Sequence, residues 1–353
     1  MIKVGTVGTG IIVEWILSAI LKTEGMECKA IYSREQVRGQ ALASKFGITK
    51  VYTDYDQLLA DEELNCIYLA SPNSLHYKQA VKALEAGKNV IIEKPFTSNY
   101  REAEYLSELA KSRGLFLFEA ITTMYLPNYL AIKNLLNQVG RVRIVHCDYS
   151  QYSSRYDLLK EGIVTNIFNP EYSGGALMDL GVYNIHFMVG LFGSPKQAYY
   201  YPNRHENGID TSGILILQYP DFICECTQAK DTWGNNGVQI QGEFGFIDVV
   251  NASNRCEQVH LVLKDQEQTL NENGDLDPWF HEFQQMSKLI KMKDYEECYH
   301  NLDTTLNVMK VLDLARESAG IHGINRYYVP RCTPRSIFVH DFHRQLLLWL
   351  FTC

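Results

Sequence analysis

The 353-residue chain lacks an apolar run of the roughly 20 residues that a membrane-spanning helix needs. Its first residues, MIKVGTVGTG, read as a strand that begins at once, without the basic and then apolar segments of a secretory leader. We therefore expect no signal peptide and a cytoplasmic protein. A formal net charge of −8 leaves no surplus of basic residues, so no nucleic-acid partner is expected. A small phosphorylated ligand needs only a local positive site and stays possible.

Paired cysteines and metal-binding motifs are also missing. The nine cysteines are odd in number. Cys224 and Cys226 alternate on one strand face instead of forming a Cys-x-x-Cys pair, so we expect reduced, structural thiols. The ten histidines include no His-Glu-x-x-His, and His340 with His343 lies in an unusual tail, so no metal site is expected.

Residues 1–120 alternate between short apolar strands and helices. The expected strands are Ile2–Val7, Cys28–Tyr32, Asn65–Ala70, Asn89–Ile92 and Leu115–Phe118, and the expected helices are Ile11–Leu21, Glu35–Phe46, Ser74–Ala86 and Tyr100–Ser112. This alternation predicts βαβ units, and therefore an α/β Rossmann domain with a doubly wound parallel sheet.

Residues 121–326 follow a different pattern, in which strands follow one another with few helices between them. The expected strands are Arg141–Tyr149, Ala198–Tyr201, Ser212–Tyr219, Ile223–Lys230, Val238–Val250 and Gln258–Leu263, and the expected helices are Leu126–Gln138, Ala176–Phe187, Pro278–Lys291 and Leu302–Ala319. We expect an α+β domain with a mostly antiparallel open sheet. Because the sheet is open, a homodimer is the expected assembly. Residues 327–353 form an atypical tail with an apolar end, either native or a reading-frame extension.

A glycine-rich turn joins the first strand to the first helix. Gly5-x-x-Gly8-x-Gly10 allows backbone N–H groups and the helix N-terminus to approach a pyrophosphate. Val13 replaces the third glycine of the usual motif, and the alternative is a tight turn without a ligand. The expected contacts of the dinucleotide at this turn are Gly8, Thr9, Gly10, Ile11 and Ile12.

The end of the second strand bears on the choice of dinucleotide. NAD sites usually carry an acidic residue there, whereas this chain has Ser33 and Arg34, with Arg38 one helical turn later. Arginine suits a 2′-phosphate as a planar, bidentate donor, so NADP(H) is favoured over NAD(H). The alternative is that both arginines are solvated charges at a helix start.

Two further strand ends should border the nicotinamide, because ligands of doubly wound sheets bind beyond the carboxyl ends of the strands. One end carries Glu93 and Lys94, with Pro95 holding the turn stiff. The other carries Ser71, Pro72 and Asn73, followed by His76, which is either near the cofactor or a solvated residue of the first helical turn.

The segment SGGALMDLGVYNIHF, residues 173–187, supplies an acid–base pair. Asp179 and Tyr183 lie at i and i+4, on one face of the expected helix. A cation beside a phenol lowers its pKa, so Lys94 near Tyr183 would make a proton-transfer device. The alternative is a core helix with a buried tyrosine.

Taken in order, four motifs resemble the Gfo/Idh/MocA oxidoreductases, nearest to the dimeric dihydrodiol dehydrogenase and glucose-fructose oxidoreductase branch. They are Gly8-x-Gly10, SPNSLH at 71–76, EKP at 93–95 and GGALMDLGVYNIH at 174–186. The resemblance implies a Rossmann domain, an α+β domain whose sheet often forms the dimer face, and the lysine of EKP near the reacting carbon. It also implies an Asp-x-x-x-Tyr pair, matched by Asp179 and Tyr183, and the NADP-using branch.

One departure concerns the domain junction, where relatives near dihydrodiol dehydrogenase read Glu-Ala-x-Trp-x-Arg-[Phe/Tyr]-x-Pro. This chain reads EAITTMYLP at 119–127, without the tryptophan and the arginine, which argues against an aromatic diol substrate.

The motifs together predict an NADP-dependent oxidoreductase that acts on a secondary alcohol or ketone of a sugar, polyol or related small molecule. Tyr183 is the first choice for the proton carrier and Lys94 the alternative, with Asp179 orienting both. Two other functions stay open: a non-catalytic, NADP-binding sugar-responsive regulator and an NAD-dependent glycoside hydrolase. Polar residues expected at the substrate are Tyr152, Arg155, Asn166, Asn169 and His186, the last of which alternatively packs in the core.

Overall fold

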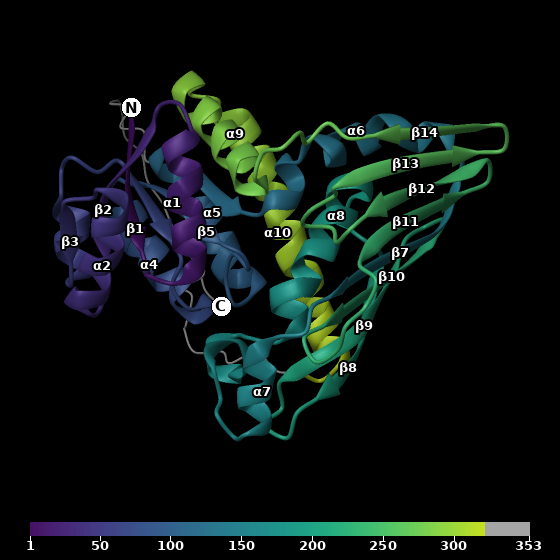
Figure 1. The fold of residues 1–353 in the computed structure, drawn as a ribbon, viewed down its shortest axis with the longest axis horizontal. Helices are drawn as coiled ribbons and strands as arrows, with labels where there is room; N and C mark the ends of the chain where they lie inside the picture. The colour runs from purple at the N-terminus through teal and green to yellow at the C-terminus, as the bar shows by residue number, and fades with distance from the viewer. Residues whose placement is uncertain (322–353) are drawn as a thin grey trace, which may run out of the picture.

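A computed structural model describes residues 1–321. The predicted tail at 327–353, with His340 and His343, lies outside the described residues. Figure 1 shows a parallel α/β layer at the N-terminus and a broad second sheet, with helices between the two. The predicted fold class is confirmed.

The first sheet has six parallel strands in the order β3-β2-β1-β4-β5-β6. This is the order of a doubly wound sheet that reverses direction between β1 and β4. The central strands are buried almost throughout, as expected for a sheet covered on both faces. The strands are β1 (Ile2–Val7), β2 (Met26–Tyr32), β3 (Lys50–Tyr52), β4 (Cys66–Leu69), β5 (Asn89–Glu93) and β6 (Leu117–Ala120).

The helices of this domain are α1 (Ile11–Lys22), α2 (Gln36–Phe46), α3 (Tyr55–Ala60), α4 (Asn73–Glu85) and α5 (Tyr100–Arg113). β3 and α3 were not predicted, because segments of three half-buried residues and of six helical residues are too short to show a period. The start of α3 is indicated by Asp54, a residue type that is common as a helix N-cap. Its side chain accepts hydrogen bonds from two backbone N–H groups of α3.

The second sheet has eight strands in the order β14-β13-β12-β11-β7-β10-β9-β8. Its pairs are antiparallel except for β7 with β10, so it is mostly antiparallel, as predicted. The strands are β7 (Val142–Ser150), β8 (Gln197–Arg204), β9 (Asp210–Gln218), β10 (Ile223–Ala229), β11 (Gly237–Gly242), β12 (Gly245–Val250), β13 (Gln258–Leu263) and β14 (Gln266–Leu270).

The single strand predicted over 238–250 is instead the hairpin of β11 and β12. The reason is close backbone contact at both ends of the turn. A Cβ on Gly242 would lie 2.2 Å from the carbonyl oxygen of Val139, and one on Gly245 would lie 2.1 Å from that of Val262. Glycine is the residue that allows this approach.

Helices cover one face of the second sheet, and Figure 1 shows α8 and α10 between the two sheets, with α9 beside α1. The helical elements are η1 (Thr122–Tyr125), α6 (Pro127–Leu135), η2 (Leu136–Gln138), α7 (Ser154–Lys160), η3 (Asn166–Phe168), η4 (Pro170–Tyr172), η5 (Leu177–Gly181), α8 (Val182–Phe192), α9 (Pro278–Met292) and α10 (Tyr295–Ser318). The short α7 and the edge strand β14 were not predicted.

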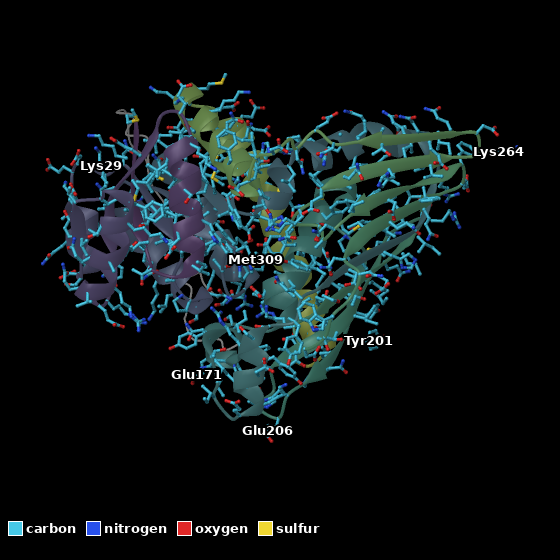
Figure 2. All side chains as sticks on the ribbon, in the orientation of Figure 1. Lys29, Glu171, Tyr201, Glu206, Lys264 and Met309 are labelled. Carbon is cyan, nitrogen blue, oxygen red and sulfur yellow. The ribbon has the colours of Figure 1, made fainter. Side chains whose placement is uncertain are left out.

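The opposite face of the second sheet carries exposed apolar side chains. Tyr201 on β8, labelled in Figure 2, is 66% exposed, and Ile223 on β10 is 50% exposed. Their strands alternate between buried and exposed residues, which is the pattern of a sheet packed on one side only.

The stretch Pro170–Phe192 is long and apolar enough to cross a membrane by length and composition alone. Most of it is buried inside the molecule, and α8 packs against α10 and β7. Its apolar character is therefore explained by its place in the core.

Candidate active site

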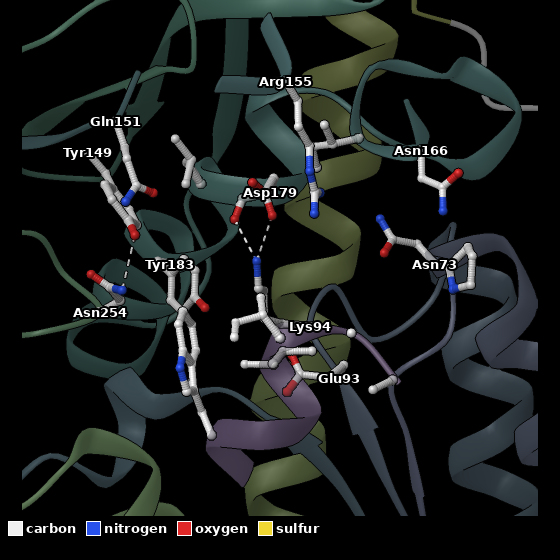
Figure 3. Close-up of a pocket in the computed structure, with 18 of the residues that line it drawn as sticks. Asn73, Glu93, Lys94, Tyr149, Gln151, Arg155, Asn166, Asp179, Tyr183 and Asn254 are labelled. Atoms are coloured by element: carbon white, nitrogen blue, oxygen red, sulfur yellow. Dashed lines mark hydrogen bonds and ion pairs between the residues drawn. The ribbon is translucent and has the colours of Figure 1, made fainter. Parts of the chain in front are cut away.

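A cavity of about 590 Å³ lies at the carboxyl ends of the first sheet's strands and is bordered on its other side by the second domain. From the first domain it is lined by the start of α1, by the segment after β4 and by the end of β5. From the second domain it is lined by the end of β7, by α7, by η5 with the first turn of α8, and by the loop 251–255. Figure 3 shows polar side chains from both domains pointing into it.

The glycine-rich turn forms one wall, as the motif predicts. Gly8 has φ +121°, and a Cβ there would lie 2.8 Å from the carbonyl oxygen of Ala70, so only glycine fits. Gly10 precedes α1, and its Cβ position has no neighbour within 4 Å. Val13, at the third motif position, is fully buried. The turn leaves open space in front of a helix N-terminus, where a phosphate binds favourably.

The end of β2 presents one unpaired cation. Arg34 is exposed and has no ion-pair partner within residues 1–321. Arg38 is held by Glu35, with its Nε 3.0 Å from the carboxylate. The Ser33 hydroxyl donates to the Glu35 carbonyl oxygen at 2.8 Å. None of these residues lines the cavity. Arg34 could hold a 2′-phosphate, whereas Ser33 and Arg38 are engaged by Glu35.

Lys94 and Asp179 meet at the centre of the cavity (Figure 3). The Lys94 ammonium donates to Oδ1 of Asp179 at 2.8 Å and to its carbonyl oxygen at 2.9 Å. Burial by itself lowers the pKa of Lys94, but the charge of Asp179, its hydrogen bond to Lys94 and the nearby Tyr183 and Glu93 together outweigh burial, so the pKa lies well above its ordinary value. Burial raises the pKa of Asp179, yet the charges of Lys230 and Lys94 hold it below its ordinary value. Both groups are therefore charged at neutral pH.

Tyr183 stands beside this ion pair. The Lys94 Nζ lies 4.9 Å from the centre of its ring, a cation–π contact. Tyr149 packs against the other side, with the ring centroids 5.8 Å apart. Within residues 1–321, the Tyr183 hydroxyl has no protein hydrogen-bond partner, and the residue lines the cavity. Burial raises the pKa of Tyr183 by more than the Lys94 charge lowers it, so the lowering by Lys94 is present, as predicted, but the net shift of the pKa is upward.

Asp179 lies in a π-helical turn and Tyr183 in the first turn of α8, whereas a single regular α-helix was expected over 176–187. The turn, η5, runs directly into α8. Such turns are frequent at functional sites.

The two glycines before this turn are required for close packing. A Cβ on Gly174 would lie 2.2 Å from the carbonyl oxygen of Ile167, and one on Gly175 would lie 2.0 Å from Oδ1 of Asp210. Asp210 in turn accepts a hydrogen bond from the Leu177 N–H at 2.7 Å. The segment Ser173-Gly174-Gly175 is thus tightly packed.

Glu93 forms the floor of the cavity and is buried. It accepts a hydrogen bond from the Tyr68 hydroxyl. Burial raises the pKa of Glu93 to about 7.

His76 is fully buried between two loops of the site, with Nε2 2.9 Å from the Ser71 carbonyl oxygen and Nδ1 3.1 Å from that of Pro95. The alternative of a solvated His76 is wrong, because the ring joins the two strand ends that border the cavity.

The predicted residues divide into two groups. Those that line the cavity are Gly10, Ile11, Ile12, Ser71, Pro72, Asn73, His76, Glu93, Lys94, Arg155, Asn166, Asp179 and Tyr183. Those that do not are Gly8, Thr9, Ser33, Arg34, Arg38, Tyr152, Asn169 and His186.

Three predicted substrate residues have other partners. The Tyr152 hydroxyl donates to Asp157 at 2.7 Å, and its ring stacks on Trp233. The Asn169 side chain accepts from the Glu171 N–H. His186 is fully buried, with Nε2 2.9 Å from Glu119, so its alternative as a core residue fits.

Several residues that build the site were not predicted. They are Trp15, Tyr149, Gln151, Lys230, Asn254, Arg255 and Trp279. Lys230 and Gln151 follow strand ends, a signal that was available. The loop 251–255 carried no signal, because its place depends on distant contacts: the hydroxyls of Thr122 and Thr123 donate to the carbonyl oxygens of Asn254 and Ser253. These threonines lie in the segment where the tryptophan and arginine are missing.

A Rossmann sheet with a lysine at the end of β5, facing an aspartate and a tyrosine from a second domain, defines a class of nicotinamide-dependent oxidoreductases. The chain belongs to the Gfo/Idh/MocA family. Residues 2–121 match the model of the oxidoreductase family with an NAD-binding Rossmann fold, and residues 129–248 match the GFO/IDH/MocA C-terminal domain. The chain is therefore an NAD(P)-dependent dehydrogenase or reductase.

Similar proteins agree with this assignment. The scyllo-inositol 2-dehydrogenase (NADP(+)) of Bacillus subtilis is 35% identical over 91% of this chain and 98% of its own length. The trans-1,2-dihydrobenzene-1,2-diol dehydrogenase of Macaca fascicularis is 30% identical over 63% of this chain and 66% of its own. The 3-ketoreductase KijD10 of Actinomadura kijaniata, solved with TDP-benzene and NADP, has the same fold, with a TM-score of 0.77, 22% identity, and coverage of 90% and 97% of the two chains.

Proposed function

We propose that this protein transfers a hydride between the nicotinamide of NADP(H) and the carbinol or carbonyl carbon of a sugar, polyol or related small molecule. The observation that carries the proposal is the junction of Lys94, Asp179 and Tyr183 on a cavity that starts at the glycine-rich turn. When bound, NADP(H) supplies the hydride chemistry. The chain's own residues bind the cofactor and the substrate and transfer one proton.

Proton transfer falls to Tyr183, with Lys94 as the alternative carrier. The raised pKa values of both groups keep them protonated at neutral pH, so they are ready to donate to an oxygen that gains negative charge. This state matches ketone reduction. In the oxidative direction a proton must first be lost, which favours alkaline pH. Asp179 fixes the Lys94 ammonium through two hydrogen bonds and so aims its third N–H at the cavity.

Cofactor preference for NADP(H) is supported by Arg34, which has no ion-pair partner among the described residues, and by the cofactor in the name of the Bacillus subtilis relative. A hydroxylated substrate is supported by the polar lining. Arg155 and Asn166 point into the cavity from the second domain, opposite Asn73 of the first (Figure 3). The same relative acts on scyllo-inositol, which makes polyols the first substrates to try.

The proposed assembly is a cytoplasmic homodimer, with residues 1–120 as the cofactor domain and 121–326 as the substrate and dimer domain. A second copy is the occupant that fits the uncovered face of the second sheet. Tyr199, Tyr201, Ile214 and Ile223 are 44%, 66%, 43% and 50% exposed there, an apolar surface typical of a subunit interface. Light scattering should give twice the 40.4 kDa chain mass, and Ile223→Lys should give monomers. A monomeric wild-type protein would contradict this assembly.

The function is tested by NADP⁺ reduction with a panel of polyols, sugars and diols, and by NADPH oxidation with the matching ketones. NAD⁺ serves as the cofactor control. Lys94→Ala should abolish turnover, whereas Lys310→Ala, which removes an exposed lysine of α10, should not. Tight NADPH binding without turnover on any member would contradict the proposal in favour of a regulator. NAD that stays bound through purification, together with glycoside cleavage, would favour the hydrolase.

A further inference from the structure

Asp179 is held by two lysines and not by one. Oδ1 accepts from Lys94 at 2.8 Å, and Oδ2 accepts from Lys230, which follows the last residue of β10. The Lys230 side chain is only 7% exposed. Within residues 1–321, the Lys230 ammonium has no other carboxylate partner. A buried lysine that reaches the acid of an active site without lining the cavity itself points to a role through that acid.

The backbone of Lys230 is fixed on both sides. Its N–H donates to the Thr211 carbonyl oxygen of β9 at 2.8 Å, and its own carbonyl oxygen accepts from the Ser153 N–H at 2.9 Å. Ser153 caps α7, the helix that carries Arg155. Lys230 therefore joins the substrate side of the cavity to the carboxylate that orients Lys94.

Two ammonium groups share one carboxylate, so the cluster of Lys94, Lys230 and Asp179 carries a net charge of +1. In a site of low dielectric such a charge acts strongly on a nearby oxygen. The Lys94–Asp179 pair alone would be neutral, with the carboxylate bound to Lys94 only. The other charged or titratable groups around the cluster are Glu93 of β5, Tyr149 of β7, Arg155 of α7, Tyr183 of α8, Asp210 of β9, Asp231 after β10 and Arg255. Glu93 and Asp210 accept hydrogen bonds from Tyr68 and Tyr200, and Asp231 accepts from Thr211 and Ser212.

We propose that Lys230 is a positioning residue of the reaction, which rests on the proposed function. By holding Oδ2 of Asp179 it keeps the site positively charged and leaves Lys94 free to donate to the substrate oxygen. Loss of this charge makes the reacting oxygen and the proton carrier harder to deprotonate. The oxidation of the alcohol then requires a higher pH.

The test compares the pH profile of alcohol oxidation in the wild type with three variants. Lys230→Gln keeps a hydrogen-bond donor and loses the charge, whereas Lys230→Arg keeps the charge. Lys88→Gln is the matched control, because Lys88 is also buried and donates to two backbone carbonyl oxygens far from the cavity.

We expect Lys230→Gln to lower kcat by about 10- to 100-fold at pH 7 and to move the acidic limb of the kcat profile up by about one pH unit, the size of shift that a neighbouring charge causes. The KM for NADP⁺ should be unchanged, and Lys230→Arg should restore the limb. An unmoved limb in Lys230→Gln, or the same loss in Lys88→Gln, would overturn the proposal. If Lys230→Gln does not fold, a displaced limb in Lys230→Arg would overturn it.

Failure of the proposed function is separable from failure of this inference. A wild-type protein that turns over no substrate contradicts the proposed function. In that case the coupling between Lys230 and Asp179 is measured from free energies of unfolding. Lys230→Gln, Asp179→Asn and the double variant form a cycle in which the effects of the two changes should be strongly non-additive. Additive unfolding free energies would overturn the inference.

Discussion

The ammonium of Lys94 lies 2.8 Å from Oδ1 of Asp179, although the two residues are 85 positions apart in the chain. Lys94 follows β5 of the first sheet, and Asp179 belongs to the π-helical turn of the second domain. The ion pair therefore forms only when the two domains are docked. The same contact links the cofactor wall of the cavity to its substrate wall.

Replacement of Lys94 by alanine should remove this link and most of the activity. We expect kcat to fall by at least about 100-fold, the loss typical of one donor to a developing oxyanion. NADPH affinity, read from nucleotide fluorescence, should change little, because the glycine-rich turn and Arg34 are untouched. Lys94→Arg should also be impaired, since a planar guanidinium does not replace a compact ammonium. An active Lys94→Ala enzyme would exclude the proposed role.

Tyr183→Phe separates the two proton carriers. The change keeps the ring under the Lys94 ammonium and removes a hydroxyl that has no protein partner within residues 1–321. The free energy of unfolding should therefore change by less than about 0.5 kcal/mol. If Tyr183 carries the proton, kcat falls by about 10²- to 10⁴-fold. A loss smaller than about tenfold would assign proton transfer to Lys94.

Glu93 should make the stability depend on pH. Its pKa is about 7 in the folded protein against 4.5 for the ordinary group, so the folded state binds this proton more tightly than the unfolded chain. The stabilisation is complete below pH 4.5 and is lost as the pH rises through 7. By linkage it amounts to roughly 3 kcal/mol. Denaturant titrations at pH 5 and pH 8 should show this loss in the wild type and a smaller one in Glu93→Gln, where Glu282, another buried carboxyl with a raised pKa, is still present.

The control for this experiment is Glu85→Gln, which changes an exposed carboxylate at the end of α4. It should keep the wild-type difference between the two pH values. A Glu93→Gln protein that also keeps it would show that Glu93 is not the group that titrates.

Arg34 should determine the preference for NADP⁺. It is exposed and unpaired among the described residues, whereas Arg38 is engaged by Glu35. Arg34→Gln should lower kcat/KM for NADP⁺ by about 10- to 100-fold, because a charge-assisted hydrogen bond to the 2′-phosphate is lost. The kcat/KM for NAD⁺ should stay unchanged. Arg101→Gln on α5 is the control for loss of a surface charge. Equal losses with both nucleotides would contradict this role.

Local patterns in the sequence predicted more of the fold than of the active site. The βαβ period and the motif spacing identified the parallel sheet and the strand ends, because these depend on neighbours in the chain. Short elements such as β3 and α3 gave too few residues for a period. His186 lies in the same segment as Tyr183, and only packing against Glu119 determines that it faces the core.

The remaining parts of the site depend on contacts between distant segments. Lys230 reaches Asp179 only because β10 pairs with β7 in parallel and so ends beside the cavity. Arg255 and Trp279 meet through a cation–π contact, with 5.6 Å between the guanidinium carbon and the ring, and Trp279 lies 5.0 Å from the Trp15 ring. No local pattern predicts that such residues share one wall.

Gly175 tests whether the packing below the π-helical turn positions the reacting groups. It has φ +107°, and a Cβ would lie 2.0 Å from Oδ1 of Asp210, the residue that accepts from the Leu177 N–H. Gly175→Ala must therefore displace Asp210 or the turn that carries Asp179. We expect a loss of at least about 2 kcal/mol in urea unfolding, from left-handed strain and overpacking together.

Gly47→Ala is the matched control, because Gly47 also has a positive φ, +69°, but its Cβ position has no neighbour within 4 Å. It should cost only the backbone strain, about 1 kcal/mol, with kcat unchanged. Gly175→Ala should in addition lower kcat while NADPH affinity stays constant, since Asp179 moves and the glycine-rich turn does not. Equal effects of the two substitutions on both stability and kcat would show that the close contact with Asp210 does not position the ion pair.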